Sequence, residues 1–220
     1  MSGQKSGNFW HVTKVKICGI TNLDDAIAAC DAGADALGFV FAEEARRRNR
    51  YIEPERAEAI IAQLPPFVTT VAVCVNATLA ELRAYLAFAD LVQLCGEEDA
   101  GAYRPVADRA LKVVHAGPGF SPGDWTNHPA RAIVLDTQLP GTHGGSGVPC
   151  DWEAARTAAG LAKPVILAGG LTPENVAEAV RTVRPYAVDT SGGVEAAPGK
   201  KDHDRIRQFI RNAQSVLSVS

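Results

Sequence analysis

Residues 15–25 read Val15-Lys16-Ile17-Cys18-Gly19-Ile20-Thr21-Asn22-Leu23-Asp24-Asp25. The first four residues are typical of a short buried strand, which Gly19 closes. Asn22 predicts the start of a helix, because its side-chain oxygen can accept hydrogen bonds from the free N–H groups of the first turn. Asp24 and Asp25 would then place negative charge at the positive end of that helix.

The side chains of this strand divide into two faces. Because strand side chains alternate, Lys16 and Cys18 share one face, and Val15 and Ile17 share the other. An apolar pair facing outward and a polar pair facing inward are typical of a barrel strand with helices packed outside it. Cys18 would then lie at the C-terminal end of the strand, where such barrels hold their chemistry.

The rest of the chain repeats the same strand-then-helix unit. Seven more strands are expected at 36–41, 70–75, 91–94, 111–115, 132–136, 164–168 and 186–189. Eight alternating units predict a parallel sheet closed into a single-domain (β/α)8 TIM barrel over residues 12–220. Residues 1–11 are expected to form a flexible extension. An open doubly wound sheet is the alternative, and the absence of G-x-G-x-x-G after the first strand weakens it.

The segments between the strands carry more specific expectations. The stretch 116–128 is loop-like, so the fifth helix should be weak or missing. Residues 42–50 should form a charged loop with four arginines. Thr172 should cap the seventh helix, with Pro173 at its first position. A last helix should bury one apolar face, formed by Ile206, Phe209, Ile210, Ala213 and Val216.

Composition limits the classes of function. The 220 residues suffice for one large α/β domain, and a net charge of −3 gives no electrostatic argument for binding nucleic acid or a membrane surface. No apolar run is long enough to span a bilayer, and the polar start of the chain is not a secretory signal. The five cysteines are odd in number and lack C-x-x-C spacing, which favours reduced thiols in the cytoplasm.

Cys18 is the first candidate catalytic residue. An inert buried thiol is the usual role of a cysteine. Here Lys16 shares its face and a helix N-terminus follows, and both features stabilise a thiolate. Cys18 is therefore predicted to act as a base or a nucleophile, with Lys16 in support.

Two aspartates end apolar strands. Asp136 follows an apolar strand on the same face as Val134, where an ionised carboxyl without a partner is costly. It either caps a loop or serves as a protonated general acid. Asp189 allows the same argument, or it could simply brace the loop at Ser191.

Glycine-rich turns follow three consecutive strands: 144–147, 169–170 and 191–193. Glycine also serves tight turns, but the loops after strands seven and eight of such barrels often bind a phosphate. Backbone N–H groups approach oxygens closely there, and the following helix adds its dipole. A phosphorylated small-molecule partner is therefore predicted, with Gly145, Gly169, Gly170, Ser191 and Gly192 as the phosphate contacts.

The arginines at 46–50 have two readings. They could form a solvated face. One guanidinium could instead bind a substrate carboxylate through two hydrogen bonds, which lysine cannot match.

Together these stretches resemble the phosphoribosylanthranilate isomerase family across residues 15–213. The resemblance rests on Lys16-Ile17-Cys18-Gly19-Ile20-Thr21 and on the stretches 33–39, 50–52, 92–94, 135–137, 144–147, 168–176 and 188–195. It implies a (β/α)8 barrel and an isomerase, an intramolecular oxidoreductase of the aldose–ketose type. The implied reaction is the Amadori rearrangement of N-(5′-phosphoribosyl)anthranilate in tryptophan biosynthesis. It implies no metal and no organic cofactor, and a monomer or a homodimer.

The resemblance also implies residue roles. It carries a general base onto Cys18, a general acid onto Asp136, a carboxylate contact onto Arg50, and phosphate contacts onto Gly169, Gly170 and the Ser191 loop. The chain departs from the family in Cys95, where histidine is common, in Gly192, where serine is frequent, in a longer loop at 42–49, and at 149–152. Another phosphosugar isomerase or lyase of the same barrel, or a non-catalytic phosphate-binding relative, is the alternative.

Overall fold

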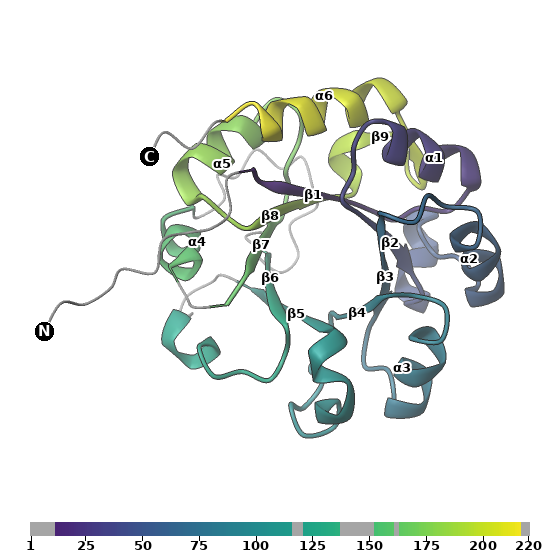
Figure 1. The fold of residues 1–220 in the computed structure, drawn as a ribbon, viewed down its shortest axis with the longest axis vertical. Helices are drawn as coiled ribbons and strands as arrows, with labels where there is room; N and C mark the ends of the chain where they lie inside the picture. Colours follow the sequence, from purple (N-terminus) through teal and green to yellow (C-terminus); the bar gives the residue numbers. More distant parts are fainter. Residues whose placement is uncertain (1–11, 116–120, 137–151, 161–162, 217–220) are drawn as a thin grey trace, which may run out of the picture.

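Eight parallel strands close into a ring in this computed structural model, which describes residues 12–115, 121–136, 152–160 and 163–216. The strands follow one another around the ring in chain order, and the first pairs with the last (Figure 1). The closed ring confirms the predicted single-domain barrel and excludes the open sheet. The strands are β1 Lys14–Cys18, β2 Ala36–Val40, β3 Thr69–Cys74, β4 Leu91–Leu94, β5 Ala110–His115, β6 Ala132–Asp136, β7 Val165–Ala168 and β8 Ala187–Thr190.

Helices surround the ring (Figure 1). They are α1 Leu23–Asp31, α2 Pro54–Ile61, α3 Leu79–Tyr85, α4 Trp152–Ala159, α5 Val176–Val183 and α6 His203–Gln214. The described residues also form shorter 3-10 helices: η1 Glu43–Arg48, η2 Arg104–Arg109, η3 Pro122–Trp125 and η4 Gly192–Val194. A hairpin of β9 Glu195–Ala197 and β10 Lys200–Lys201 precedes α6. No helix in the described ranges is both long and apolar enough to cross a membrane.

The connections on either side of β5 differ from the regular unit. Among the described residues between β5 and β6, only η3 is helical, which confirms the weak fifth helix. The segment before β5 corrects the sequence analysis, because η2 stands where the repeating unit predicts an α-helix. Val106 inside η2 has a non-helical φ of −126°, so the segment is kinked rather than continuous.

Helix starts were predicted with mixed success. Asn22 caps α1 as predicted, and its side chain accepts from the N–H of Asp25 at 2.8 Å. The prediction that Thr172 caps the seventh helix was wrong, because Asn175 is the N-cap of α5. The Asn175 side chain instead closes the preceding turn, accepting from Thr172 N at 2.8 Å and donating to Gly170 O at 3.0 Å. The charged loop at 42–50 contains η1.

Apolar side chains form two layers, one on each face of the barrel wall. The outer layer packs the strands against the helices and includes Val15, Ile17 and the buried face of α6, with Val216 at its edge. The inner layer fills the ring and consists of Cys18, Val71, Val73, Leu111, Ala132, Val134, Ile166, Ala168 and Ala187. The first strand therefore divides between the layers as its alternation predicts.

A buried ion pair joins β5 to the loops that follow β3 and β4. Lys112 on β5 contacts Glu98 at 2.6 Å and the carbonyl of Gly96, and the Lys112 and Glu98 side chains are 8% and 5% exposed. Glu98 also accepts from the N–H groups of Asn76 and Gly96, at 2.8 and 3.1 Å. Burial opposes ionisation of Glu98, but Lys112 and the N–H groups outweigh it and lower its pKa.

Glu98→Gln tests this pair. The change leaves the Lys112 charge buried without a counter-charge, so we expect a loss of about 3–5 kcal/mol in the free energy of unfolding. Urea denaturation at pH 7 measures it. The double variant Glu98→Gln/Lys112→Met should regain most of the loss, because an apolar replacement of the whole pair is often neutral. Equal losses in the single and double variants would contradict a charge effect.

The same pair predicts a dependence on pH. Because the pKa of Glu98 is lower in the folded protein than its ordinary value of 4.5, its stabilisation is present above that pH. It should be lost as the pH falls through the folded pKa. The stability difference between the parent protein and Glu98→Gln should therefore shrink between pH 5 and pH 3, roughly the window for a carboxyl. A constant difference would contradict the assignment.

Candidate active site

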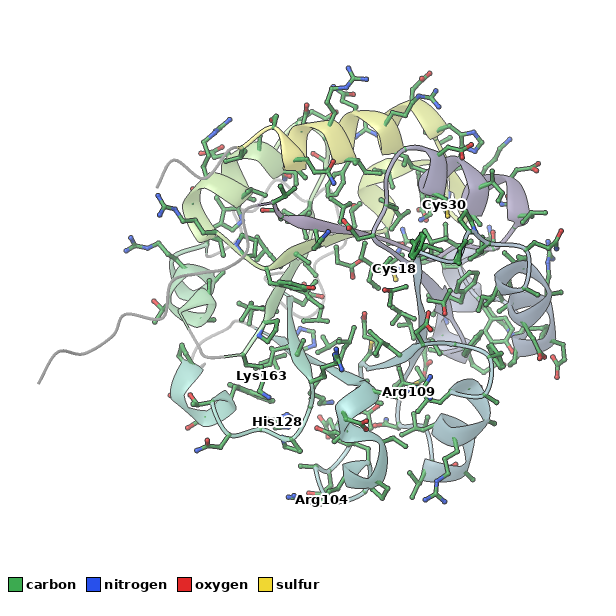
Figure 2. All side chains as sticks on the ribbon, in the orientation of Figure 1. Cys18, Cys30, Arg104, Arg109, His128 and Lys163 are labelled. Carbon is green, nitrogen blue, oxygen red and sulfur yellow. The ribbon has the colours of Figure 1, made fainter. Side chains whose placement is uncertain are left out.

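Cys18 ends β1 on the inner face of the ring. Its side chain belongs to the inner apolar layer, and Figure 2 shows it toward the centre of the ring, with Cys30 farther out on α1. The thiol is 8% exposed, so it lies at the mouth of the ring rather than in open solvent. β1 therefore places the sulfur at the C-terminal end of the barrel strands, where the active sites of such barrels lie.

Gly38 makes room for this thiol. It is the residue paired with Cys18 across β1 and β2. A Cβ atom at Gly38 would lie 2.7 Å from the Cys18 Sγ atom and 3.2 Å from its Cα atom. Only a residue without a side chain lets the thiol lie against the neighbouring strand in this position.

A buried ion pair lies one residue layer below the thiol. The Lys16 Nζ atom lies 2.9 Å from Asp189 Oδ2, and the two side chains are 4% and 8% exposed. Burial disfavours the ammonium, but Asp189 and Cys18 together raise the pKa of Lys16. Lys16 therefore keeps its positive charge inside the ring, next to Cys18.

Asp189 is used in this pair rather than as a brace for the Ser191 loop. Its other oxygen, Oδ1, is buried and has no hydrogen-bond partner among the described residues. The sequence left a protonated acid or a loop brace open for Asp189 and did not predict its pairing with Lys16. The register explains the outcome, because Lys16 and Asp189 are direct partners across β1 and β8.

Asp136 ends β6, and two strands, β7 and β8, separate it from β1 around the ring. Alternation places it on the inward face together with Val134, which belongs to the inner layer. In register it lies between His115 of β5 and Ala168 of β7. The strand ends thus bring a carboxyl and a thiol to the same end of the barrel.

The glycine turns after β7 and β8 pack directly on each other. Gly169 and Gly170 have φ of +96° and +65°, which residues with side chains rarely adopt. A Cβ atom at Gly193 would lie 1.9 Å from the carbonyl oxygen of Leu171. The two turns therefore meet backbone to backbone at one edge of the mouth. Gly145 lies outside the described residues.

Arg50 is the arginine that reaches the mouth. Its Nε and Nη2 atoms donate to Glu195 at 2.9 and 2.7 Å. Arg46 instead pairs with Glu43 and Glu53 on the surface, and its guanidinium lies 3.5 Å from the centre of the Tyr51 ring. The structure thus separates the two readings of the cluster, with Arg46 on a solvated face and Arg50 at the site.

Glu195 and Lys201 were not singled out from the sequence. Lys201 contacts Glu195 at 3.1 Å and donates to the carbonyl of Ser191 at 3.1 Å. Its side chain is completely buried, and burial lowers its pKa although Glu195 partly offsets this. The sequence shows a glutamate and two lysines after the last glycine loop. Only the fold shows that Glu195 contacts Arg50 and that Lys201 contacts Glu195.

A second thiol, Cys95, packs against the inner layer beside Gln93. Burial raises the pKa of Cys95 to about 12, with a further contribution from Cys18, so it stays a neutral thiol at physiological pH. It cannot supply the base that an imidazole could supply at this position. No group of three or more His, Cys, Asp or Glu in the described segments could hold a metal ion.

A closed β/α barrel that gathers a thiol, a carboxyl and two facing glycine turns at its strand ends belongs to the class of acid–base enzymes that act on phosphorylated small molecules. A family model described as N-(5′-phosphoribosyl)anthranilate (PRA) isomerase matches residues 15–212. The chain belongs to this family.

Individual relatives of this chain support the family assignment. The N-(5′-phosphoribosyl)anthranilate isomerase of Pelobacter propionicus is 48% identical over 94% of this chain and 98% of its own. The crystal structure of phosphoribosyl anthranilate isomerase from Thermotoga maritima has a TM-score of 0.83 and 43% identity, covering 93% of this chain and all of that one. Another such structure, at 41% identity and a TM-score of 0.77 over 93% of this chain and 100% of that one, contains reduced 1-(o-carboxyphenylamino)-1-deoxyribulose 5-phosphate.

Gly38→Ala tests the fit around Cys18. The added methyl group should displace the thiol while the strand remains intact, because φ at Gly38 is not positive. We expect turnover to fall about 100-fold, the scale of effect of a misplacement of about 1 Å, and the free energy of unfolding to fall by about 1–3 kcal/mol from overpacking. Steady-state kinetics and thermal unfolding measure the two effects.

Gly123→Ala is the matched control, because its nearest side-chain neighbour would lie 3.8 Å from the new Cβ atom. It should leave both activity and stability nearly unchanged. Full activity in Gly38→Ala would mean that the thiol does not need its present position.

Proposed function

We propose that the protein converts N-(5′-phosphoribosyl)anthranilate to 1-(2-carboxyphenylamino)-1-deoxyribulose 5-phosphate, a step of tryptophan biosynthesis. The observation that carries the proposal is the inward Cys18 thiol, seated on Gly38 and above Lys16, at the strand ends that also carry Asp136 and the facing glycine turns. Membership of the isomerase family supports it.

Asp136 acts first, as the general acid. It donates a proton to the furanose ring oxygen, and the bond between that oxygen and C1′ breaks. The nitrogen lone pair forms a C1′=N double bond, so the sugar opens to a protonated Schiff base. This role needs a carboxyl that arrives protonated, and Asp136 stands in register with Ala168 at the end of β6.

Cys18 acts second, as the general base. Its thiolate removes the proton from C2′, and the electrons of that C–H bond move toward nitrogen to give an enolamine. Tautomerisation then yields the ketone at C2′ and a CH₂ group at C1′. The reaction is balanced without an external oxidant or reductant, because C1′ is reduced as C2′ is oxidised.

Two anchors orient the substrate. The turns at Gly169, Gly170, Ser191 and Gly192, with Gly145 as a further contact predicted from the sequence, bind the phosphate through backbone N–H groups. Arg50 binds the anthranilate carboxylate. Fixing both ends of the substrate holds C2′ at the thiol, which converts binding into correct orientation. The assembly is a monomer or a homodimer, which light scattering on the purified protein distinguishes.

Cys18→Ser and Asp136→Asn test the mechanism. Each should lower kcat by about 100-fold to 10,000-fold, the usual contribution of a positioned acid or base. The change in anthranilate fluorescence during turnover measures the rate, and phosphate-ester product binding reports whether the site remains intact. A fully active Cys18→Ser protein would remove the thiol from the mechanism.

The same assay separates the alternatives. A different phosphosugar isomerase or lyase would act on another phosphorylated sugar and leave anthranilate fluorescence constant. A non-catalytic relative would bind the product without turnover. Either result from the parent protein would contradict the proposed function.

A further inference from the structure

Arg50 is held along one side of its guanidinium. Glu195 accepts from Nε and Nη2, so the hydrogen bonds use the lateral edge of the planar group. Among the residues that the structure describes, no other group accepts a hydrogen bond from the Arg50 guanidinium. A guanidinium has a second bidentate edge, formed by Nη1 and Nη2, and that edge can still bind another carboxylate.

Glu195 and the two cations that contact it carry a net positive charge. Arg50 and Lys201 both contact its carboxylate, at 2.7 and 3.1 Å. Burial opposes ionisation of Glu195, but the two cations outweigh it and lower its pKa, so the carboxylate is charged at neutral pH. Within this group of three residues, two cations and one anion leave one positive charge, which attracts a ligand carboxylate.

The cluster of Arg50, Glu195 and Lys201 lies next to two glycines at the mouth of the ring. The Arg50 Cδ atom and the Lys201 Nζ atom would each lie 3.5 Å from a Cβ atom at Gly19, the residue after Cys18. A Cβ atom at Gly192 would lie 2.7 Å from Arg50 Nη2. The lack of a side chain at Gly192 thus gives Arg50 its space beside the mouth.

The hairpin gives Glu195 a firm base. Lys201 donates its backbone N–H to Asp25 at 3.0 Å, and Thr21 donates to the carbonyl of Gly199 at 2.9 Å. These bonds tie β9 and β10 to the loop and helix that follow Cys18 (Figure 1). Glu195 is therefore fixed relative to β1, the strand that carries Cys18. Arg50 lies at the end of the charged loop, and the orientation of its guanidinium depends on Glu195.

We propose that Glu195 is a positioning residue. It holds the Nε–Nη2 edge of Arg50 so that the Nη1–Nη2 edge faces the anthranilate carboxylate of the substrate, and Lys201 supplies the counter-charge that keeps Glu195 in place. This inference rests on the proposed function. It makes Glu195 a determinant of selectivity for substrates that carry this carboxylate.

Paired ligands test the proposal. The probes are reduced 1-(2-carboxyphenylamino)-1-deoxyribulose 5-phosphate and its phenylamino counterpart, which lacks the carboxylate. Isothermal titration gives Kd for each with the parent protein and with Glu195→Gln. We expect Glu195→Gln to weaken the carboxylate ligand about 10-fold to 100-fold, the range for losing an aligned charged hydrogen-bond pair, and to change the other ligand less than about twofold.

Kinetics and a double-mutant cycle supply a second readout. Glu195→Gln should raise KM for the substrate far more than it lowers kcat. In an Arg50→Ala background, the same change should have little further effect on Kd, because the residue acts through Arg50. Glu53→Gln, which removes the carboxylate partner of Arg46 on the surface, is the matched control and should leave both values unchanged.

Other outcomes would overturn the inference. Equal weakening of both ligands would mean that Glu195 is only structural, and tighter binding of the carboxylate ligand would mean that it competes for Arg50. If Glu195→Gln is unstable, Glu195→Gln/Lys201→Met removes the buried unpaired charge, and the ratio of the two Kd values still decides. A parent protein that binds neither ligand would contradict the proposed function itself.

Discussion

The buried contact between Lys16 and Asp189 is the interaction on which the site depends. The two residues are 173 positions apart and meet only because β1 pairs with β8 at the seam of the ring. Either charge alone inside the barrel would be strongly destabilising, by about 3–5 kcal/mol for a broken buried pair. Closure of the ring therefore brings these two opposite charges together inside the barrel. Cys18 lies one residue layer above the ion pair.

The same seam collects the rest of the site. The loop after β1, the turn after β8 and the β9–β10 hairpin meet there, and Arg50 joins them from the loop after β2. Asp25 strengthens the junction by accepting from Lys201 N at 3.0 Å and pairing with His203 at 2.8 Å. Much of the site is thus built by segments from opposite ends of the chain, which lets one closed ring hold thiol, cations and glycine turns in fixed relation.

Local patterns predicted much of the fold but few of the contacts. The bounds of β4 and β6 match the expected 91–94 and 132–136, because each is a short and largely apolar segment. The α5 start was misplaced because Thr172 and the Asn175 side chain close a turn before the helix, which begins only after Asn175. The glutamate partners of Arg50 and Lys112 were missed, since no periodicity relates residues 145 or 14 positions apart.

A crystal structure with reduced 1-(2-carboxyphenylamino)-1-deoxyribulose 5-phosphate tests the central claim most directly. The account predicts C2′ next to the Cys18 Sγ atom, the hydroxyl derived from the ring oxygen at Asp136, and the phosphate at Gly170 and Gly192. The ligand carboxylate should lie on the Nη1–Nη2 edge of Arg50, with Glu195 still on the other edge. A ligand bound with C2′ away from the thiol, or with its phosphate outside the glycine turns, would contradict the account.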